Sequence, residues 1–272
     1  MSSNKVIRLF GLSKGTVYYK RRGYPQNRKS LRVQNKEQEN VILDICKDRA
    51  TYGVPRVRAI ANRDYGQKMS FYKVRRVMKE KNLLIEKVSN PRKSREHTGK
   101  VMVPFPNTRW SSDITSIKLW DGTKVRFSYI LDCCDRSIIA YRLGKRMQAS
   151  DIELMLEQAI YSRFPKGPNS IKYLEFLHDN GPEYTELKLQ KQLKAWGIKN
   201  CNTPTYSPQS NGMCEAFNGT FKRDYVYQNC LDDFDTLNEQ IGNWVKVYNT
   251  FAPHSALGMK TPHEFYTLKK AA

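Results

Sequence analysis

The sequence lacks the features that define several protein classes. None of its six cysteines forms a Cys-x-x-Cys pair, and its four histidines lack zinc-ligand spacing, so neither a zinc finger nor a disulfide framework is indicated. No run approaches the roughly 18 apolar residues that a membrane span needs, and the N-terminus has no secretory hydrophobic segment. Internal repeats, low-complexity tracts and sustained heptads are also missing. We therefore expect a cytoplasmic protein with reduced thiols.

Acidic residues are scarce in the first third of the chain. Residues 1–100 contain 26 Lys and Arg against 8 Asp and Glu, whereas residues 101–272 contain 21 against 18. The excess cations fall on predicted helices with aromatic and small polar residues between them, which favours nucleic acid as the partner. A solvated basic surface, or binding to a membrane surface, is the alternative interpretation.

The basic third contains helix-turn-helix-like patterns. Apolar spacing and capping residues predict three helices: one over about 34–49, one that begins near Pro55, and one over 70–80. A shorter helix after Ser13 could complete a partial helix-turn-helix, or could belong to a basic N-terminal arm. A small three-helix domain with a charged exterior is the alternative to DNA contact. The predicted DNA-contacting residues in this region are Lys14, Lys20, Arg56, Arg58, Lys73, Arg75 and Arg76.

The remaining two thirds alternate between strand and helix patterns. Three consecutive strands are expected over about 110–119, 124–133 and 137–144. Helices and strands then alternate, with a helix over 149–163, a strand from about 171 to 178, a helix over 185–196, a short strand at 198–202 and a helix starting near residue 214. The tail is expected to contain one helix at 234–249. This order predicts an α/β fold, a ribonuclease-H-like domain whose mixed five-stranded sheet carries helices on both faces, preceded by small all-α helix-turn-helix domains. The expected divisions are a basic helical segment 1–50, a helix-turn-helix-like domain 51–86, a linker 87–108, a catalytic core 109–228, and a C-terminal helix and tail 229–272.

Three acids stand in distinctive local settings. Asp113 opens the first alternating strand, Asp179 ends a later strand, and Glu215 begins a helix after a loop rich in Pro, Ser, Gln and Asn. Carboxylates at two strand ends and one helix start can converge on Mg²⁺, which prefers oxygen ligands. Two such ions can stabilise the attacking and leaving oxygens of a displacement at phosphorus. We expect Asp113 to bridge both ions, Asp179 to bind one and Glu215 the other.

Other residues compete for these roles. Asp132 and Asp135 could coordinate metal, but turn or capping roles are favoured for both. Glu183 is interpreted as a loop or surface residue, and His178 as a structural or supporting one. On the predicted helix, Lys222 shares the face of Glu215 and is a candidate DNA contact, with a solvated lysine as the alternative.

Three of the segments around these acids resemble the integrase-like transposases of bacterial insertion sequences, within the retroviral integrase superfamily. They are residues 110–113, 178–184 and 207–217. Lys222 falls where that family often has a basic residue, and the tail from 248 to 262 is similar to the family's C-terminal signature. Residues 131–136, with 97–100, narrow the resemblance to OrfB products similar to that of insertion sequence two.

The resemblance implies a Mg²⁺-dependent transposase, with Mn²⁺ able to replace Mg²⁺. Such enzymes nick DNA at the terminal inverted repeats of their element, join the freed 3′-hydroxyl to another strand and, in this branch, form a circular intermediate. The resemblance also implies double-stranded DNA as substrate, a frameshift fusion or partnership with OrfA, homo-oligomers on DNA and a nucleoid-associated location. It adds Arg223, beside Lys222, to the predicted DNA contacts.

Two other functions remain open from the sequence. The chain could be a DNA-binding regulator with an inactive ribonuclease-H-like domain, although the intact acid triad argues against this. It could also be a structure-selective nuclease that cleaves without joining, although the helix-turn-helix-like segments favour recognition of element ends.

Overall fold

The computed structural model describes residues 36–85, 103–202 and 212–271. The chain divides into a unit Met1–Val41 and a larger unit Ile42–Ala272. The predicted DNA contacts Lys14 and Lys20 lie outside the described residues.

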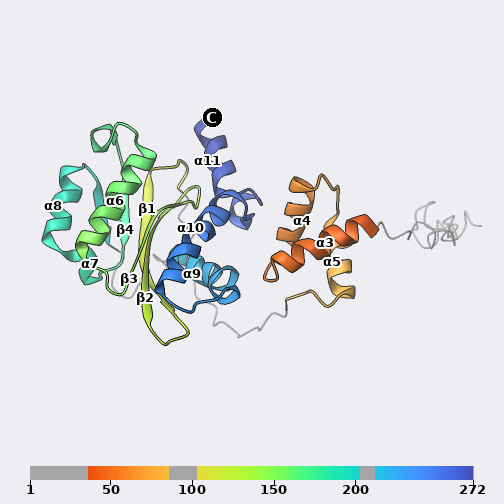
Figure 1. Cartoon of the computed structure of the whole chain (residues 1–272). Coiled ribbons are helices and arrows are strands. Elements are labelled where there is room, and N and C mark those ends of the chain that lie inside the picture. The colour runs from red at the N-terminus through yellow and green to blue at the C-terminus, as the bar shows by residue number, and fades with distance from the viewer. Residues whose placement is uncertain (1–35, 86–102, 203–211, 272) are drawn as a thin grey trace, which may run out of the picture. The chain divides into compact units, whose positions relative to one another are not determined.

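Three helices occur in the basic part of the chain, close to the positions that the sequence predicted. They are α3 (Lys36–Asp48), α4 (Val54–Asp64) and α5 (Phe71–Glu80) (Figure 1). Pro55 stands in the first turn of α4, and the Ser70 side chain caps α5 by accepting from the Lys73 backbone N–H. Each helix buries its apolar stripe, including Val57 of α4 and Val74 of α5, both with no exposed surface.

A mixed five-stranded sheet forms the centre of the second domain, in the order β3-β2-β1-β4-β5. The strands are β1 (Arg109–Lys118), β2 (Lys124–Asp132), β3 (Ile138–Gly144), β4 (Glu175–His178) and β5 (Lys199–Asn202). The first three pair antiparallel, whereas β4 pairs parallel with both β1 and β5. This arrangement confirms the ribonuclease-H-like α/β prediction.

Helices cover both faces of the sheet (Figure 1). On one face, α6 (Ala149–Arg163) and α8 (Leu187–Ala195) pack with the sheet around Trp110 and Phe176. On the other face lie α9 (Gly212–Asp224) and α10 (Phe234–Thr250). Two further helices are α7 (Pro182–Thr185) and α11 (Pro262–Ala271).

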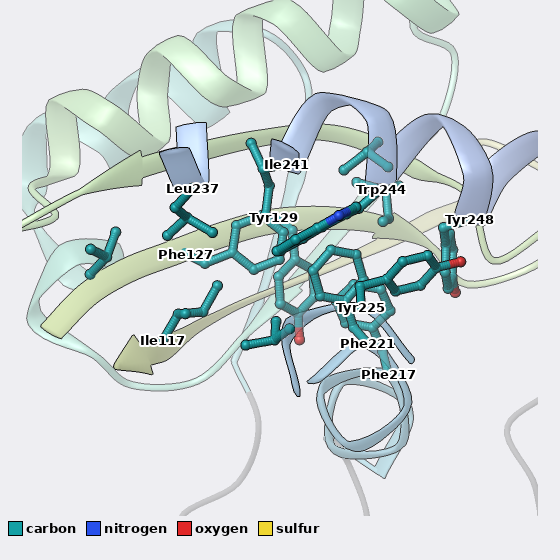
Figure 2. Close-up of a cluster of buried hydrophobic side chains, with 14 of the residues drawn as sticks. Ile117, Phe127, Tyr129, Phe217, Phe221, Tyr225, Leu237, Ile241, Trp244 and Tyr248 are labelled. Carbon is teal, nitrogen blue, oxygen red and sulfur yellow. The ribbon is translucent and has the colours of Figure 1, made fainter. Parts of the chain in front are cut away.

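An aromatic cluster fastens α9 to the sheet (Figure 2). Phe221 of α9 stacks on Phe127 of β2 at 5.2 Å between ring centroids, and Phe217 lies 4.3 Å from the ring of Tyr129. Trp244 and Tyr248 of α10 close the cluster from the far side. Because these large side chains are buried together, α9 has little freedom to rotate about its own axis.

Two elements differ from the sequence-based expectation. The strand expected from about residue 171 begins only at Glu175, because its partner β1 begins at Arg109, which pairs with Glu175. The tail was expected to contain one helix at 234–249, but a second, α11, follows Thr261. Thr261 and Glu264 exchange backbone and side-chain hydrogen bonds, which makes a capping box for α11. None of the described helices is both long and apolar enough to cross a membrane.

Glu175 ties the start of β4 to both neighbouring strands, and this tie should depend on pH. Its carboxylate accepts from Arg109 Nε at 2.6 Å, from Lys199 Nζ at 3.0 Å and from the Tyr173 hydroxyl. The hydrogen bond from Tyr173, helped by those from Lys199 and Arg109 and opposed by burial, lowers the pKa of Glu175 to about 2. The charged form is therefore the one that the fold stabilises.

We predict that Glu175→Gln lowers the free energy of unfolding by about 1–3 kcal/mol at pH 7. Since the folded pKa lies below the unfolded one, the contribution of Glu175 is present above about pH 4.5 and is lost as pH falls toward 2. Urea unfolding at pH 7, 4.5 and 3 should show the gap between wild type and variant narrowing. A gap that does not change with pH would contradict this account.

Candidate active site

Asp113 lies on β1, and Asp179 directly follows the neighbouring parallel strand β4. Ser111 of β1 pairs with Leu177 of β4, which is the last pair of this ladder, and the two aspartates each follow two residues later. Neighbouring strands lie about 4.8 Å apart, so the two backbones are adjacent at this position. The parallel pairing therefore brings together two acids that are far apart in sequence.

Asp113 does not lie at a strand end, as its sequence setting had suggested. It stands in the middle of β1 and pairs with Tyr129 of β2. Asp179 nevertheless lies near Asp113 because β4 is short. Since β4 ends at His178, the chain leaves the sheet at Asp179, beside the middle of β1. Both carboxylates are partly exposed.

The third acid lies on the helix that covers this position. Glu215 is an exposed residue in the first turn of α9, and Asn218 follows three residues later on the same helix face. Asn218 Nδ2 donates to Asp113 Oδ2 at 2.7 Å. Residues three apart on a helix have neighbouring side chains, so Glu215 lies about one helical turn from Asn218, the residue that bonds Asp113.

Tyr129 fixes the orientation of the Asn218 amide. Its fully buried hydroxyl lies 2.9 Å from Asn218 Oδ1, and 3.4 Å from both Asp113 Oδ2 and the carbonyl of Cys214. All three neighbours are acceptors, and the single hydroxyl proton goes to the nearest one. Burial raises the pKa of Tyr129 well above its usual value, so the hydroxyl stays protonated. The Asn218 amide nitrogen is thereby directed at Asp113 Oδ2.

The turn after β4 holds the Asp179 side chain closely. The Gly181 backbone N–H donates to Asp179 Oδ1 at 3.0 Å. A Cβ on Gly181 would lie only 3.0 Å from Asp179 Oδ1 and from Glu183 Oε2. On the other side, His178 Nδ1 lies 2.5 Å from the Asp179 carbonyl oxygen and its Nε2 lies 2.6 Å from Asn200 Oδ1, which confirms a structural role for His178.

Lys222 adds a cation to the same helix face. It follows Asn218 by one turn on α9 and is partly buried. Burial lowers its pKa, and the neighbouring negative charge of Asp113 opposes that change. The face of α9 that points to the aspartates therefore combines one carboxylate, one amide and one ammonium group.

The three acids share one region without forming a closed metal site. Within residues 36–85, 103–202 and 212–271, no three Asp, Glu, His or Cys side chains are close enough together to hold a metal ion. The donor types nevertheless suit a hard divalent cation, since all three are carboxylates. The observed hydrogen bonds to Asp113 reach one oxygen, Oδ2, which is compatible with metal binding through the other.

Asp132 and Asp135 have structural partners, as expected, whereas Glu183 lies on the short helix α7 and is largely buried rather than on a surface loop. Asp132 is fully buried and accepts from the backbone N–H groups of Asn107, Cys134 and Asp135, which makes it a turn cap. Asp135, also buried, pairs with Arg163 at 3.1 Å. Glu183 lies 3.4 Å from Arg126, beside the Asp179 turn.

Two arginines of α4 are engaged within the larger unit. Arg56 donates from Nη1 to Asp224 Oδ2 at 2.5 Å and from Nε to the carbonyl of Pro253 at 3.2 Å. The Asp224 carboxylate has no exposed surface. Arg63 likewise donates to the carbonyl of Phe251 at 2.9 Å. Arg56 was a predicted DNA contact, and these hydrogen bonds use two of its three guanidinium nitrogens. They also join α4 to the C-terminal end of α9, the helix that carries Glu215.

The other predicted DNA contacts differ in exposure. Arg58 is exposed, but its Nε donates to the carbonyl of Met69 at 2.9 Å. Arg223 is half exposed and pairs with Asp224 at 2.8 Å. On α5, by contrast, Arg75 and Arg76 point to solvent beside the 81% exposed Tyr72.

Sequence reasoning gave no role to four residues that contact this site. They are Ser112, Tyr129, Tyr184 and Asn218. Asn218 could have been inferred, because it lies three residues after Glu215 on the predicted helix. The partners of the other three are set by strand register and packing, which the sequence pattern does not reveal.

Comparison with known proteins supports this architecture. Two family models, both described as the integrase core domain, match residues 104–208 and 190–262, and a third, the HTH-like domain, matches residues 33–92. An intasome of simian T-cell lymphotropic virus, in complex with a PP2A regulatory subunit, contains a chain of the same fold. Its TM-score is 0.52 at 19% identity, covering 79% of this chain and 70% of that one.

Curated relatives are more similar in sequence. An uncharacterized protein of insertion element IS136 from Agrobacterium fabrum is 40% identical over 69% of this chain and 96% of its own length. Transposase InsD of insertion element IS2 from Escherichia coli is 32% identical over 79% of this chain and 73% of its own length.

The fold and the family models together define the class of this protein, which combines an integrase catalytic core with an HTH-like domain. Within that class, this chain belongs to the insertion-sequence transposases with an integrase-like core.

We predict that Gly181→Ala impairs catalysis without unfolding the protein. The backbone at Gly181 has φ −59°, which alanine adopts readily, so stability should change by less than about 1 kcal/mol. The added Cβ must displace the Asp179 carboxylate by a few tenths of an ångström. Since small misplacements of reacting groups are costly, DNA-strand cleavage should fall about tenfold or more.

Gly53→Ala is the matched control. Gly53 has an ordinary φ of −78°, and a Cβ there meets nothing closer than 3.8 Å. Strand cleavage by this variant should equal that of wild type. Equal cleavage rates for Gly181→Ala and wild type would show that the close approach has no catalytic importance.

Proposed function

We propose that this transposase uses Asp113, Asp179 and Glu215 to hold two divalent metal ions, Mg²⁺ or Mn²⁺, while it cleaves the ends of its element and joins them to new DNA. The observation that carries this proposal is the placement of Asp113 and Asp179 just beyond the last residue pair of the parallel β1–β4 ladder, with the helix of Glu215 bonded to Asp113 through Asn218.

The chemistry consists of two displacements at phosphorus. In the first, a water oxygen bonds to phosphorus and the P–O3′ bond at the element end breaks, which frees a 3′-hydroxyl. In the second, that hydroxyl attacks a phosphate of another strand and displaces its 3′-oxygen, so one phosphodiester replaces another. Bound divalent ions would stabilise the attacking and leaving oxygens in both steps.

The chain's own residues supply orientation and charge balance. Asn218, itself oriented by the Tyr129 hydroxyl, fixes one oxygen of Asp113, and the Gly181 N–H fixes one oxygen of Asp179. Both carboxylates are thus held before substrate arrives, which lowers the reorganisation needed in the reaction. Lys222, on the same helix face as Glu215, is placed to contact a DNA phosphate near the reacting group.

We assign DNA contact in the HTH-like domain to α5 rather than to α4. The α4 residue Arg56 is bonded to Asp224 and Pro253, whereas Arg75 and Arg76 of α5 are exposed. An exposed basic helix after a short turn is the arrangement that enters the major groove in helix-turn-helix proteins. The element's terminal inverted repeats are the proposed target, with an OrfA portion and further copies of the chain completing the assembly.

We predict that Asp113→Asn, Asp179→Asn and Glu215→Gln each reduce Mg²⁺-dependent nicking and joining at least about 100-fold. The substrate is DNA that flanks the gene, and a gel assay separates nicked from joined products. DNA affinity should change little, and EDTA should abolish activity in wild type.

Asp121→Asn is the control, because Asp121 caps the exposed β1–β2 hairpin through Thr123. It should retain full activity. Joining by Asp113→Asn at the wild-type rate would refute the proposal. Nicking without joining by wild type would indicate a nuclease, and binding without any metal-dependent product would indicate a regulator.

A second prediction concerns α5. Replacing both Arg75 and Arg76 with Ala should weaken DNA binding and reduce the slope of log K against log salt concentration by about two, one for each lost phosphate contact. The control removes two exposed cations of α8, Lys191 and Lys194. An equal loss in both double variants would mean that binding is not localised to α5.

A further inference from the structure

A fully buried tyrosine joins the turn that carries Asp179 to the strand that carries Asp113. Tyr184, on α7, is 1% exposed, and its hydroxyl lies 2.8 Å from Ser112 Oγ, which is also 1% exposed. Ser112 precedes Asp113 directly, and Tyr184 follows Asp179 by five residues. The contact therefore spans the two segments whose separation determines the distance between the aspartates.

The hydrogen-bond direction in this contact can be assigned. Ser112 Oγ donates its only proton to the carbonyl of Tyr129 at 2.8 Å, so the Tyr184 hydroxyl must donate to Ser112 Oγ. Burial raises the pKa of Tyr184 far above its usual value, so the hydroxyl remains a donor throughout the working pH range. The result is a chain of two hydrogen bonds that links α7, β1 and β2.

The Tyr184 ring also stabilises the start of the same turn. It stacks on the His178 ring at 4.7 Å with an interplanar angle of 11°. His178 in turn contacts the Asp179 carbonyl oxygen and Asn200. A ring stack therefore closes the turn on itself, and the buried Tyr184 hydroxyl holds it to β1, in addition to the partly exposed pair of Glu183 with Arg126 of β2.

We propose that Tyr184 is a positioning residue for the metal-binding carboxylates, an inference that rests on the proposed function. Its hydroxyl fixes the spacing between Asp113 and Asp179 by holding the Asp179 turn to Ser112. Packing alone would keep the turn near the sheet, but a hydrogen bond restricts both distance and direction far more narrowly. Partners that orient metal-binding side chains are typically worth 10–100-fold in metal affinity.

Tyr184→Phe isolates this effect. The variant keeps the ring, its stack on His178 and the packing, and loses only the hydroxyl. Ser112 then still donates to the Tyr129 carbonyl, so the variant does not leave the Ser112 hydroxyl without an acceptor. In EDTA the melting temperature should fall by only a few degrees, as for the loss of one hydrogen bond.

Two readouts separate positioning from simple stability. The first is the Mn²⁺ concentration that gives half of the maximal thermal stabilisation, which Tyr184→Phe should raise about tenfold. The second is amide hydrogen exchange of the segment 179–186 in EDTA. Exchange should become faster because the turn loses its bond to Ser112 and opens more often. Ser112→Ala should raise the Mn²⁺ requirement similarly, and the double variant should be no worse than the more affected single variant.

Tyr248→Phe is the matched control, since Tyr248 is a buried phenol in the cluster on the opposite face of the sheet. It should leave both readouts unchanged. Unchanged exchange and an unchanged Mn²⁺ requirement in Tyr184→Phe would overturn the proposal, as would additive effects in the double variant. Failure of the proposed function would give a different result from failure of this inference. If the acids do not bind metal, wild type and Asp113→Asn would show the same thermal response to Mn²⁺. The exchange experiment, which is done in EDTA, would still test the role of Tyr184.

Discussion

The parallel pairing of β1 with β4 is the constraint on which the active-site geometry depends. The last pair of this ladder is Ser111 with Leu177, so Asp113 follows two residues later on β1. Asp179 follows two residues later on the other chain segment, where β4 has ended and the chain turns out of the sheet beside the middle of β1. A one-residue slip would send one of the two side chains to the other face, because successive strand residues point in opposite directions. The ion pairs of Glu175 at the start of β4 and the Tyr184–Ser112 bond beyond its end resist such a slip.

Helix α9 brings the third acid, Glu215, to this pair, and the two faces of the helix have different roles. Phe217 and Phe221 are buried against Tyr129 and Phe127, so the opposite face, with Glu215, Asn218 and Lys222, is held beside Asp113. Tyr129 contributes to both sides: its ring belongs to the aromatic cluster and its hydroxyl orients Asn218. Core packing and active-site orientation are therefore coupled through a single residue. At its C-terminal end the same helix presents the buried Asp224 to Arg56 of α4.

Much of this could be predicted from the sequence, and the failures have physical causes. Alternation of period two located β1, β2 and β3 to within one or two residues, and apolar spacing located α5, α6 and α10. These signals are local, because each element buries one face of its own sequence. The start of β4 was placed four residues early, since strand length depends on where the partner strand begins. The role expected for Arg56 shows the same limit: its charge suggested DNA, but a buried carboxylate distant in sequence engages it.

The sequence by itself determined the chemical components: two aspartates and a glutamate in recognisable settings, a basic helical domain and an α/β core. Those properties follow from residue type and local periodicity. Tertiary structure alone decided which atoms meet, including the Asn218 bond to Asp113, the Tyr184 bond to Ser112 and the close approach of Gly181 to Asp179. Each of these depends on strand register, helix rotation or turn geometry, which are set by packing between segments distant along the chain.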